Sequence, residues 1–184
     1  MLKYALLGML NYQPMTGYQL KQFMDNSTKH LWYADQSQIY RTLKSLTENK
    51  LLNSTIEAQD GRPDKRIYLI TELGQADFLR WLAQPVTKIE AVKDTVLLKL
   101  FFSGGLDKEV VLTHLRLQRA LYQQQQLKMI SDDIQTNIEQ TKETVPELRR
   151  DALMWEATRR FGEQVAELAV SWLDETIVMV ETEF

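Results

Sequence analysis

The fold is decided by residues 36–74, which read QSQIYRTLKSLTENKLLNSTIEAQDGRPDKRIYLITELG. In the first part of this stretch, Ile39, Leu43 and Leu46 recur at the i, i+4, i+7 spacing that gives a helix one apolar edge. Asp35 is a suitable N-cap for a helix over residues 36–50. The other faces of this helix are polar and carry Gln38, Arg41, Lys44 and Ser45. The pattern predicts an amphipathic helix whose polar face is free to meet a partner.

Two short strands follow this helix. Residues 52–56 and 66–70 fit strands, and the five residues 60–64 between them are turn formers, with Gly61 able to adopt a positive φ and Pro63 holding its own φ fixed. We therefore expect a β-hairpin. Its tip and return strand carry three donors suited to phosphate contact, which are Arg62, Lys65 and Arg66.

Composition excludes most catalytic chemistry. The chain has 184 residues, 44% of them hydrophobic, which is enough for a packed core. It contains no cysteine and only two distant histidines, so it offers no disulfide, no thiolate nucleophile and no zinc cluster within one chain. His30 and His114 each lack a ligand at metal-binding spacing, and no glycine-rich phosphate loop is present. We expect neither an enzyme nor a cofactor.

The charge distribution permits binding to a polyanion although the chain is acidic overall. Residues 1–85 hold ten Lys and Arg against eight Asp and Glu, giving +2, whereas residues 86–184 hold twelve against seventeen, giving −5, and the two add to the net charge of −3. The positive half is the one that contains the hairpin. Net acidity therefore does not argue against DNA as a partner.

The rest of the first half fits three further helices. One runs from Leu2 to about residue 12, and Thr16 can cap a second that ends near residue 26. Thr71 can cap another helix, which Pro85 would end, and we place the domain boundary there, giving domains 1–85 and 86–184. The apolar N-terminus is too short for a membrane span and lacks a cleavage site, so a cytoplasmic protein without a membrane partner is expected.

The second half should be entirely helical. A helix over residues 88–102 is expected before Gly104 and Gly105, followed by two long helices over residues 107–143 and 146–182, each able to span about 55 Å. One apolar stripe comprises Leu127, Ile130, Ile134 and Ile138, and the other comprises Leu153, Ala157, Phe161, Val165, Leu168, Trp172 and Thr176. Because a small domain cannot bury both stripes, we expect a second chain to cover them.

Three separated motifs together resemble the PadR family of bacterial transcriptional regulators. They are Gly17-Tyr18-Gln19-Leu20, the run SQIYRTLKSL over residues 37–46 leading to Leu51, and the run GRPDKRIYLITELG over residues 61–74. In the second half, the runs LLKLFF at 97–102 and WLD at 172–174 are similar to the longer branch of that family. The resemblance implies a mainly α protein with a small β-hairpin: a winged helix-turn-helix plus a long-helix C-terminal dimerisation domain.

The same resemblance implies a repressor of a nearby operon that is relieved by a small ligand or a stress signal. In a winged helix, the helix that starts at Gln36 enters the major groove, so its predicted base readers are Gln36, Ser37, Gln38, Arg41 and Lys44. Tyr40 is predicted to contact a phosphate, and Arg62, Lys65 and Arg66 to hold the flanking backbone. A two-fold homodimer would place two such helices about 34 Å apart on a roughly palindromic double-stranded operator.

Two questions stay open at the level of sequence. The same helix and hairpin would also serve a winged-helix adaptor that binds proteins without specific DNA recognition, although the basic hairpin favours DNA. The residues that bind a small-molecule effector are not assigned. Trp32, Trp155 and Trp172 can wall an aromatic pocket or simply pack in the core.

Overall fold

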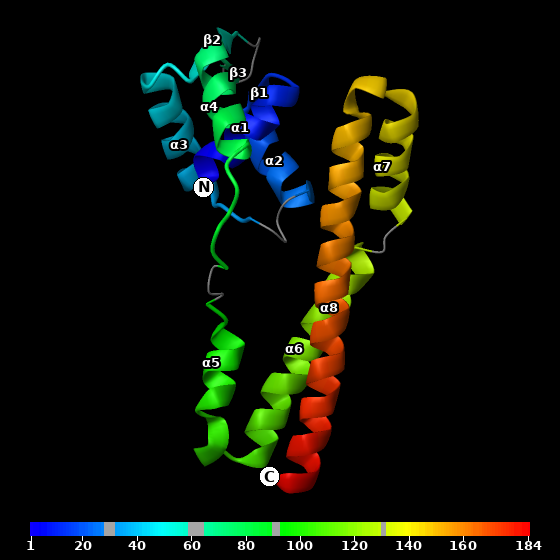
Figure 1. The fold of residues 1–184 in the computed structure, drawn as a ribbon. Helices are drawn as coiled ribbons and strands as arrows, with labels where there is room; N and C mark the ends of the chain where they lie inside the picture. The colour runs from blue at the N-terminus through cyan, green and yellow to red at the C-terminus, as the bar shows by residue number, and fades with distance from the viewer. Residues whose placement is uncertain (28–31, 59–64, 90–92, 130–131) are drawn as a thin grey trace. The chain divides into compact units, whose positions relative to one another are not determined.

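A computed structural model describes residues 1–27, 32–58, 65–89, 93–129 and 132–184 (Figure 1). The chain forms two compact units, Met1–Glu90 and Ala91–Phe184. Among the described residues, the first unit combines four helices with a small sheet, and every regular element of the second unit is a helix. The predicted fold class, mainly α with a β-hairpin, is confirmed.

The described residues of the first unit form seven elements. They are α1 (Leu2–Tyr12), β1 (Met15–Thr16), α2 (Gly17–Ser27), α3 (Gln36–Glu48), β2 (Leu52–Glu57), β3 (Lys65–Ile70) and α4 (Glu72–Leu82). The antiparallel pair β2 and β3 is the predicted hairpin, in a register that runs from Leu52 opposite Ile70 to Glu57 opposite Lys65. β1 was not expected from the sequence. It pairs with β3 through Met15 opposite Tyr68, which makes a three-stranded sheet in the order β1-β3-β2.

The core of the first unit lies between its helices and the sheet. Ile39, Leu43 and Leu46 are buried, as their spacing predicted, so α3 turns its apolar edge inward. They pack with Leu6 and Leu7 of α1, with further buried residues Leu20, Met24, Leu52 and Tyr68. Helix α4 closes the unit by stacking Trp81 on Tyr4 of α1, with 4.5 Å between ring centroids.

The second unit consists of α5 (Thr95–Phe101), α6 (Lys108–Met129), α7 (Asp132–Thr144) and α8 (Arg149–Glu183), with short 3-10 turns at Ser103–Gly105 and Pro146–Leu148. Figure 1 shows α6 beside the C-terminal half of α8 and α7 beside its N-terminal half. Val111, Leu112 and Leu115 of α6 form a core with Leu173 and Val180 of α8.

Two predicted helix boundaries are wrong. The helix expected over residues 88–102 begins only at Thr95, because the Asp94 carboxylate accepts hydrogen bonds from the backbone N–H groups of Val96 and Leu97 and so caps α5 there. The single helix expected over residues 107–143 is two helices, since α6 ends at Met129 and α7 begins at Asp132.

The apolar stripe predicted on α8 remains largely exposed within the single chain. Leu153, Phe161, Val165, Leu168 and Trp172 all face solvent, and Thr176 is the buried exception. The buried face of α8 instead carries Ala152, Arg159, Gly162, Ala166, Leu173, Thr176 and Val180. Arg159 donates to Glu156 and Glu163 on the same helix, so its charge is paired where it is buried.

Candidate nucleic-acid interface

Helix α3 begins at a capping box centred on Asp35. The Asp35 carboxylate accepts from the Gln38 backbone N–H at 2.7 Å and from the Ser37 hydroxyl at 2.7 Å. In return, the Asp35 backbone N–H donates to Oε1 of Gln38 at 3.0 Å. The hydrogen bond from Gln38, followed by that from Ser37, lowers the pKa of the Asp35 carboxyl below its ordinary value. The start of the predicted recognition helix is therefore fixed by local bonds.

All six predicted α3 contact residues are exposed: Gln36, Ser37, Gln38, Tyr40, Arg41 and Lys44. They do not share one face, however. At about 100° per residue, Ser37, Arg41 and Lys44 lie opposite the buried edge of α3. Gln36 and Tyr40 fall on one flank of the helix, and Gln38 falls on the other. The outward face is the one that a groove would meet first.

The two cations of the outward face are only loosely engaged. Nε of Arg41 donates to the Ser37 carbonyl oxygen at 3.3 Å, and its Nη2 lies 3.5 Å from the Ser37 hydroxyl. Lys44 lies 3.9 Å from Glu48, and both side chains are well exposed. Exposed pairs of this kind contribute little to stability. Both cations can therefore turn to a phosphate or a base at small cost.

Gln38 is more restricted than the sequence predicted. Its Oε1 is the acceptor in the capping box, so only its NH₂ group is free to donate while the cap is intact. Bidentate recognition of adenine needs both the oxygen and the nitrogen of an amide. Gln38 can therefore read adenine in that manner only if it leaves the cap.

The described part of the hairpin presents Lys65 and Arg66, both exposed on β3. Because side chains alternate along a strand, these two cations project from opposite faces of the hairpin. Arg66 shares its face with the buried Tyr68, which is thus a core aromatic. Such an arrangement suits contact with both walls of a groove better than contact with a flat surface. Arg62 and the predicted hairpin tip lie outside the described residues.

The structure adds exposed side chains that the sequence predictions missed. Tyr18 at the start of α2 is 61% exposed and Tyr33 just before α3 is 60% exposed. Lys21 of α2 places its ammonium group 4.9 Å from the centroid of the Tyr33 ring.

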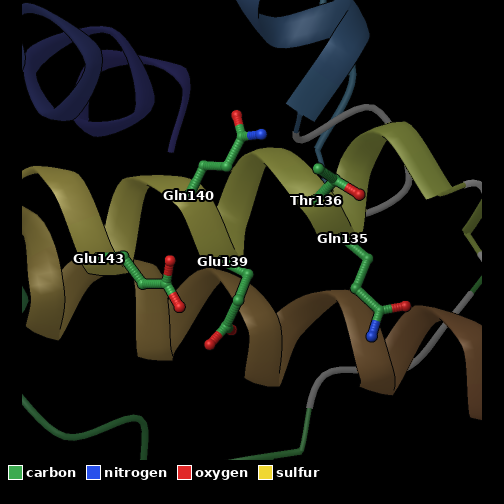
Figure 2. Close-up of a pocket in the computed structure, with 5 residues that line it drawn as sticks. All are labelled: Gln135, Thr136, Glu139, Gln140 and Glu143. Atoms are coloured by element: carbon green, nitrogen blue, oxygen red, sulfur yellow. The ribbon is translucent and has the colours of Figure 1, made fainter.

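The second unit carries a different kind of surface. A polar depression of about 470 Å³ on α7 is lined by Gln135, Thr136, Glu139, Gln140 and Glu143, shown in Figure 2. Lys142 donates to Glu139 at 2.9 Å. With two carboxylates and no apolar wall, this depression suits neither DNA nor an apolar effector. His114 is exposed on α6, and His30 lies outside the described residues.

A capped, outward-facing basic helix packed on two further helices, followed by a basic antiparallel hairpin, defines a winged helix-turn-helix domain. Proteins that combine this domain with a helical second unit include transcriptional regulators. Among the described residues, no helix is both long and apolar enough to cross a membrane.

Comparison with known proteins gives the family. Residues 6–80 match the transcriptional regulator PadR-like family, and residues 92–181 match the C-terminal region of the virulence activator alpha family. The chain is 32% identical over 184 residues to the probable transcriptional regulator Rv1176c of Mycobacterium tuberculosis, covering 95% of this chain and 94% of that one. The chain belongs to the PadR-like family, whose members are transcriptional regulators and not enzymes, as the three motifs predicted.

A second relative has been solved with two different ligands. The negative transcriptional regulator PadR of Bacillus subtilis is 26% identical over 182 residues, covering 98% of this chain and 97% of that one. Its structure in complex with operator DNA has a TM-score of 0.76 at 23% identity, covering 97% of this chain and 98% of the other. Its complex with p-coumaric acid has a TM-score of 0.64 at 21% identity, covering 99% and 96%. These structures establish the shared fold.

Proposed function

We propose that this protein is a homodimeric repressor that binds a roughly palindromic double-stranded operator near its own gene and is released by a small ligand or stress signal. The observation that carries the proposal is the outward face of α3. It presents Arg41 and Lys44 without a strong ionic partner among the described residues, beside a hairpin that adds Lys65 and Arg66. The B. subtilis relative, described as a negative regulator and solved with operator DNA, supports the same role here.

In this proposal the chain divides its work between its two halves. Residues 1–85 bind DNA, with Ser37, Arg41 and Lys44 toward the base edges and Tyr40, Lys65 and Arg66 toward the phosphates. Gln36 and Gln38 lie on the flanks of α3 and contact the groove walls. Arg62 belongs to the same basic hairpin by its place in the sequence.

Residues 86–184 hold the dimer together. No residue of the seven-residue helix α5 is buried in the single chain, and Phe101 and Phe102 are 81% and 73% exposed. A helix this short is not stable alone and needs tertiary contacts. On α8, Phe161, Leu168 and Trp172 are exposed as well. A second copy of the chain supplies an apolar partner for both surfaces, and its two-fold symmetry accounts for a palindromic operator.

The test is a mobility-shift and footprinting experiment on the DNA upstream of the gene. The full-length protein should protect a roughly palindromic site with half-sites about one helical turn apart. The double variant Arg41→Ala with Lys44→Ala should lose operator binding while light scattering still reports a dimer. As a matched control, Lys128→Ala with Arg160→Ala removes one exposed lysine and one exposed arginine from the second unit and should leave binding intact.

Two results would count against the proposal. Binding that is independent of DNA sequence and unaffected by the Arg41 and Lys44 substitutions would show that α3 does not recognise the operator sequence. A dimer that binds no DNA but binds a protein partner through α3 would favour the alternative of a winged-helix adaptor.

A further inference from the structure

The Asp35 carboxylate at the start of α3 fixes the hydrogen-bonding role of an outward-facing serine. It accepts from the Ser37 hydroxyl at 2.7 Å, in addition to capping the helix at the Gln38 backbone N–H. Because a hydroxyl carries a single proton, Ser37 cannot donate to another group while this bond is made, although its oxygen can still accept. Asp35 therefore holds Ser37 as an acceptor.

Arg41 lies beside this acceptor and can only donate. Its Nη2 lies 3.5 Å from the Ser37 hydroxyl oxygen, and its Nε donates to the Ser37 carbonyl oxygen at 3.3 Å. After the hydrogen bonds from Gln38 and Ser37, the charge of Arg41 also lowers the pKa of Asp35, so the carboxylate and the guanidinium attract each other. These contacts draw the guanidinium toward Ser37, at the N-terminal end of α3.

The two side chains are placed so that one partner can meet both. Ser37 and Arg41 are exposed, and residues four apart lie on the same face of a helix, one turn from each other. The outward face of α3 thus presents one acceptor with a group of donors next to it. A serine whose hydroxyl could rotate freely would present either a donor or an acceptor at this place.

One base pair matches this order of donors and acceptor. In the major groove, guanine offers two acceptors, N7 and O6, and the cytosine paired with it offers the N4 donor. Arginine can bind N7 and O6 of guanine together, whereas adenine offers one acceptor and one donor on the same edge. The Ser37 oxygen can accept from cytosine N4. A G·C pair therefore satisfies both side chains.

We infer that Asp35 sets the base preference of α3 without touching DNA, by holding Ser37 as an acceptor beside the donors of Arg41, so that each operator half-site presents a G·C pair to these two side chains. The inference rests on the proposed function, because Ser37 and Arg41 must first meet base edges in a major groove. Asp35 is a positioning residue in this arrangement. Without it, the Ser37 hydroxyl can accept from cytosine or donate to thymine O4, and the preference for G·C falls.

The experiment measures DNA affinity of the full-length protein by fluorescence anisotropy. Each G·C pair of the footprinted half-site is replaced in turn by A·T, and the ratio of the two affinities gives the G·C preference at that position. At the pair that Arg41 and Ser37 contact, the wild type should prefer G·C by about tenfold or more. Asp35→Ala and Ser37→Ala should each lower this preference about fivefold, the effect of losing about one hydrogen bond.

Two further variants separate positioning from helix capping. Asp35→Asn keeps an oxygen that can accept from the Ser37 hydroxyl and from the Gln38 N–H, so it should retain most of the G·C preference. Asp94→Ala removes the corresponding cap from α5, where the carboxylate accepts from two backbone N–H groups, and should leave the preference unchanged. If Asp35 only capped α3, Asp35→Ala would weaken the G·C and A·T operators alike.

Base analogues test the two contacts one at a time. 7-Deazaguanine lacks the N7 acceptor, so it should weaken binding of the wild type but not of Arg41→Ala. N4-Methylcytosine replaces the groove-facing N4 hydrogen with a methyl group, and should weaken the wild type about fivefold while affecting Ser37→Ala little. Inosine lacks only the N2 amino group of guanine, which lies in the minor groove, and should bind normally.

Three results would overturn the inference. They are a half-site at which no G·C pair is preferred, a G·C preference in Asp35→Ala equal to that of the wild type, and an equal effect of N4-methylcytosine on the wild type and on Ser37→Ala. Failure of the proposed function would remove the inference as well, but it appears in the wild type alone, as no preference for the operator over unrelated DNA. Failure of the inference leaves that preference in place and removes only its dependence on Asp35 and Ser37.

Discussion

Gly17 lies against the ring of Tyr40, so that a Cβ added at Gly17 would sit 2.6 Å from Cε1 and 2.8 Å from Cζ of that ring. Real Cβ atoms do not approach a ring so closely. Gly17 is the first residue of α2 and Tyr40 lies in α3, so the contact sets how near the start of α2 comes to α3. Glycine is needed here for space.

We predict that Gly17→Ala displaces Tyr40 and weakens operator binding, with a cost of about 1–3 kcal/mol in stability because the added methyl group overpacks the contact. The change in helix propensity has the opposite sign, since alanine is favoured over glycine by about 1 kcal/mol within a helix. Any loss therefore reports the clash. Thermal unfolding and operator titration measure the two effects.

The matched background for this prediction is Tyr40→Ala, which removes the ring. In the Tyr40→Ala background, Gly17→Ala should leave the stability unchanged or raise it. A loss of stability equal to that in the wild type would show that the clash with Tyr40 is not the cause. Gly104→Ala is the control for glycine replacement, because a Cβ at that position meets nothing within 4 Å.

Gly74→Ala should be more damaging to folding. A Cβ at Gly74 would lie 2.2 Å from the Leu51 carbonyl oxygen, and a backbone atom cannot move aside as a flexible side chain can. The same carbonyl accepts from the Thr71 backbone N–H at 3.1 Å, which ties the residue before β2 to the N-cap of α4. We expect a loss of about 3 kcal/mol or more in the free energy of unfolding, measured by chemical denaturation. Gly105→Ala, in open space, should cost far less.

The sequence predicted the elements whose signals are local. The spacing of Ile39, Leu43 and Leu46 indicated the buried edge of α3. Asp35 and Thr71 were correctly predicted as the N-caps of α3 and α4. β1 was not predicted, because two residues are too few to show the alternation of a strand. It forms only by pairing with β3 at Tyr68, far along the chain. The helix predicted over residues 88–102 was too long because apolar periodicity extends upstream of Asp94, whereas the Asp94 cap decides where α5 starts.

The candidate site was predictable in its residue types but not in its geometry. Exposure of Arg41 and Lys44 follows from helical periodicity alone. That the Gln38 oxygen is used in the cap depends on a rotamer, and that Gly17 meets Tyr40 depends on how two helices pack. A surface depression beside α3 is lined by Leu2, Trp32 and Arg41, which come from three segments that no local pattern brings together.

The capping box predicts a particular pH dependence. Its hydrogen bonds lower the pKa of Asp35, so the stabilisation that they give is fully present above the ordinary aspartate pKa of about 3.9 and is lost as the pH falls through the lower, folded pKa. Asp35→Asn keeps a cap acceptor that does not titrate. The stability advantage of the wild type over Asp35→Asn should therefore shrink between about pH 5 and pH 3, as followed by urea denaturation. A difference that is constant over this range would mean that the carboxylate charge contributes nothing.

The hairpin cations predict a salt effect without a change in specificity. Each phosphate contact contributes about 0.9 to the slope of log K against log salt concentration, so Lys65→Gln with Arg66→Gln should lower the slope by about 1.8. Operator and unrelated DNA should be weakened alike, because phosphate contacts carry no sequence information. Arg41→Gln should instead reduce the ratio of specific to nonspecific affinity. If the hairpin variant altered that ratio and Arg41→Gln did not, the hairpin would be the element that reads bases and Arg41 would contact phosphate.

Phe101 gives the sharpest prediction for the second unit. It is 81% exposed in the single chain, on a helix without a buried residue, so in the proposed dimer the second copy would bury it. Burying such a side chain contributes about 1.5–3 kcal/mol, and a two-fold interface counts each position twice, so Phe101→Asp should weaken dimerisation about 10²- to 10⁴-fold. Light scattering should then report one chain at concentrations where the wild type reports two, and operator affinity should fall with it. Val86→Asp, at a position 84% exposed and outside any helix, supplies the control. In the proposed dimer the pairing of the two α3 helices depends on this interface, so a Phe101→Asp variant that stays dimeric and binds operator normally would place the dimer contact elsewhere.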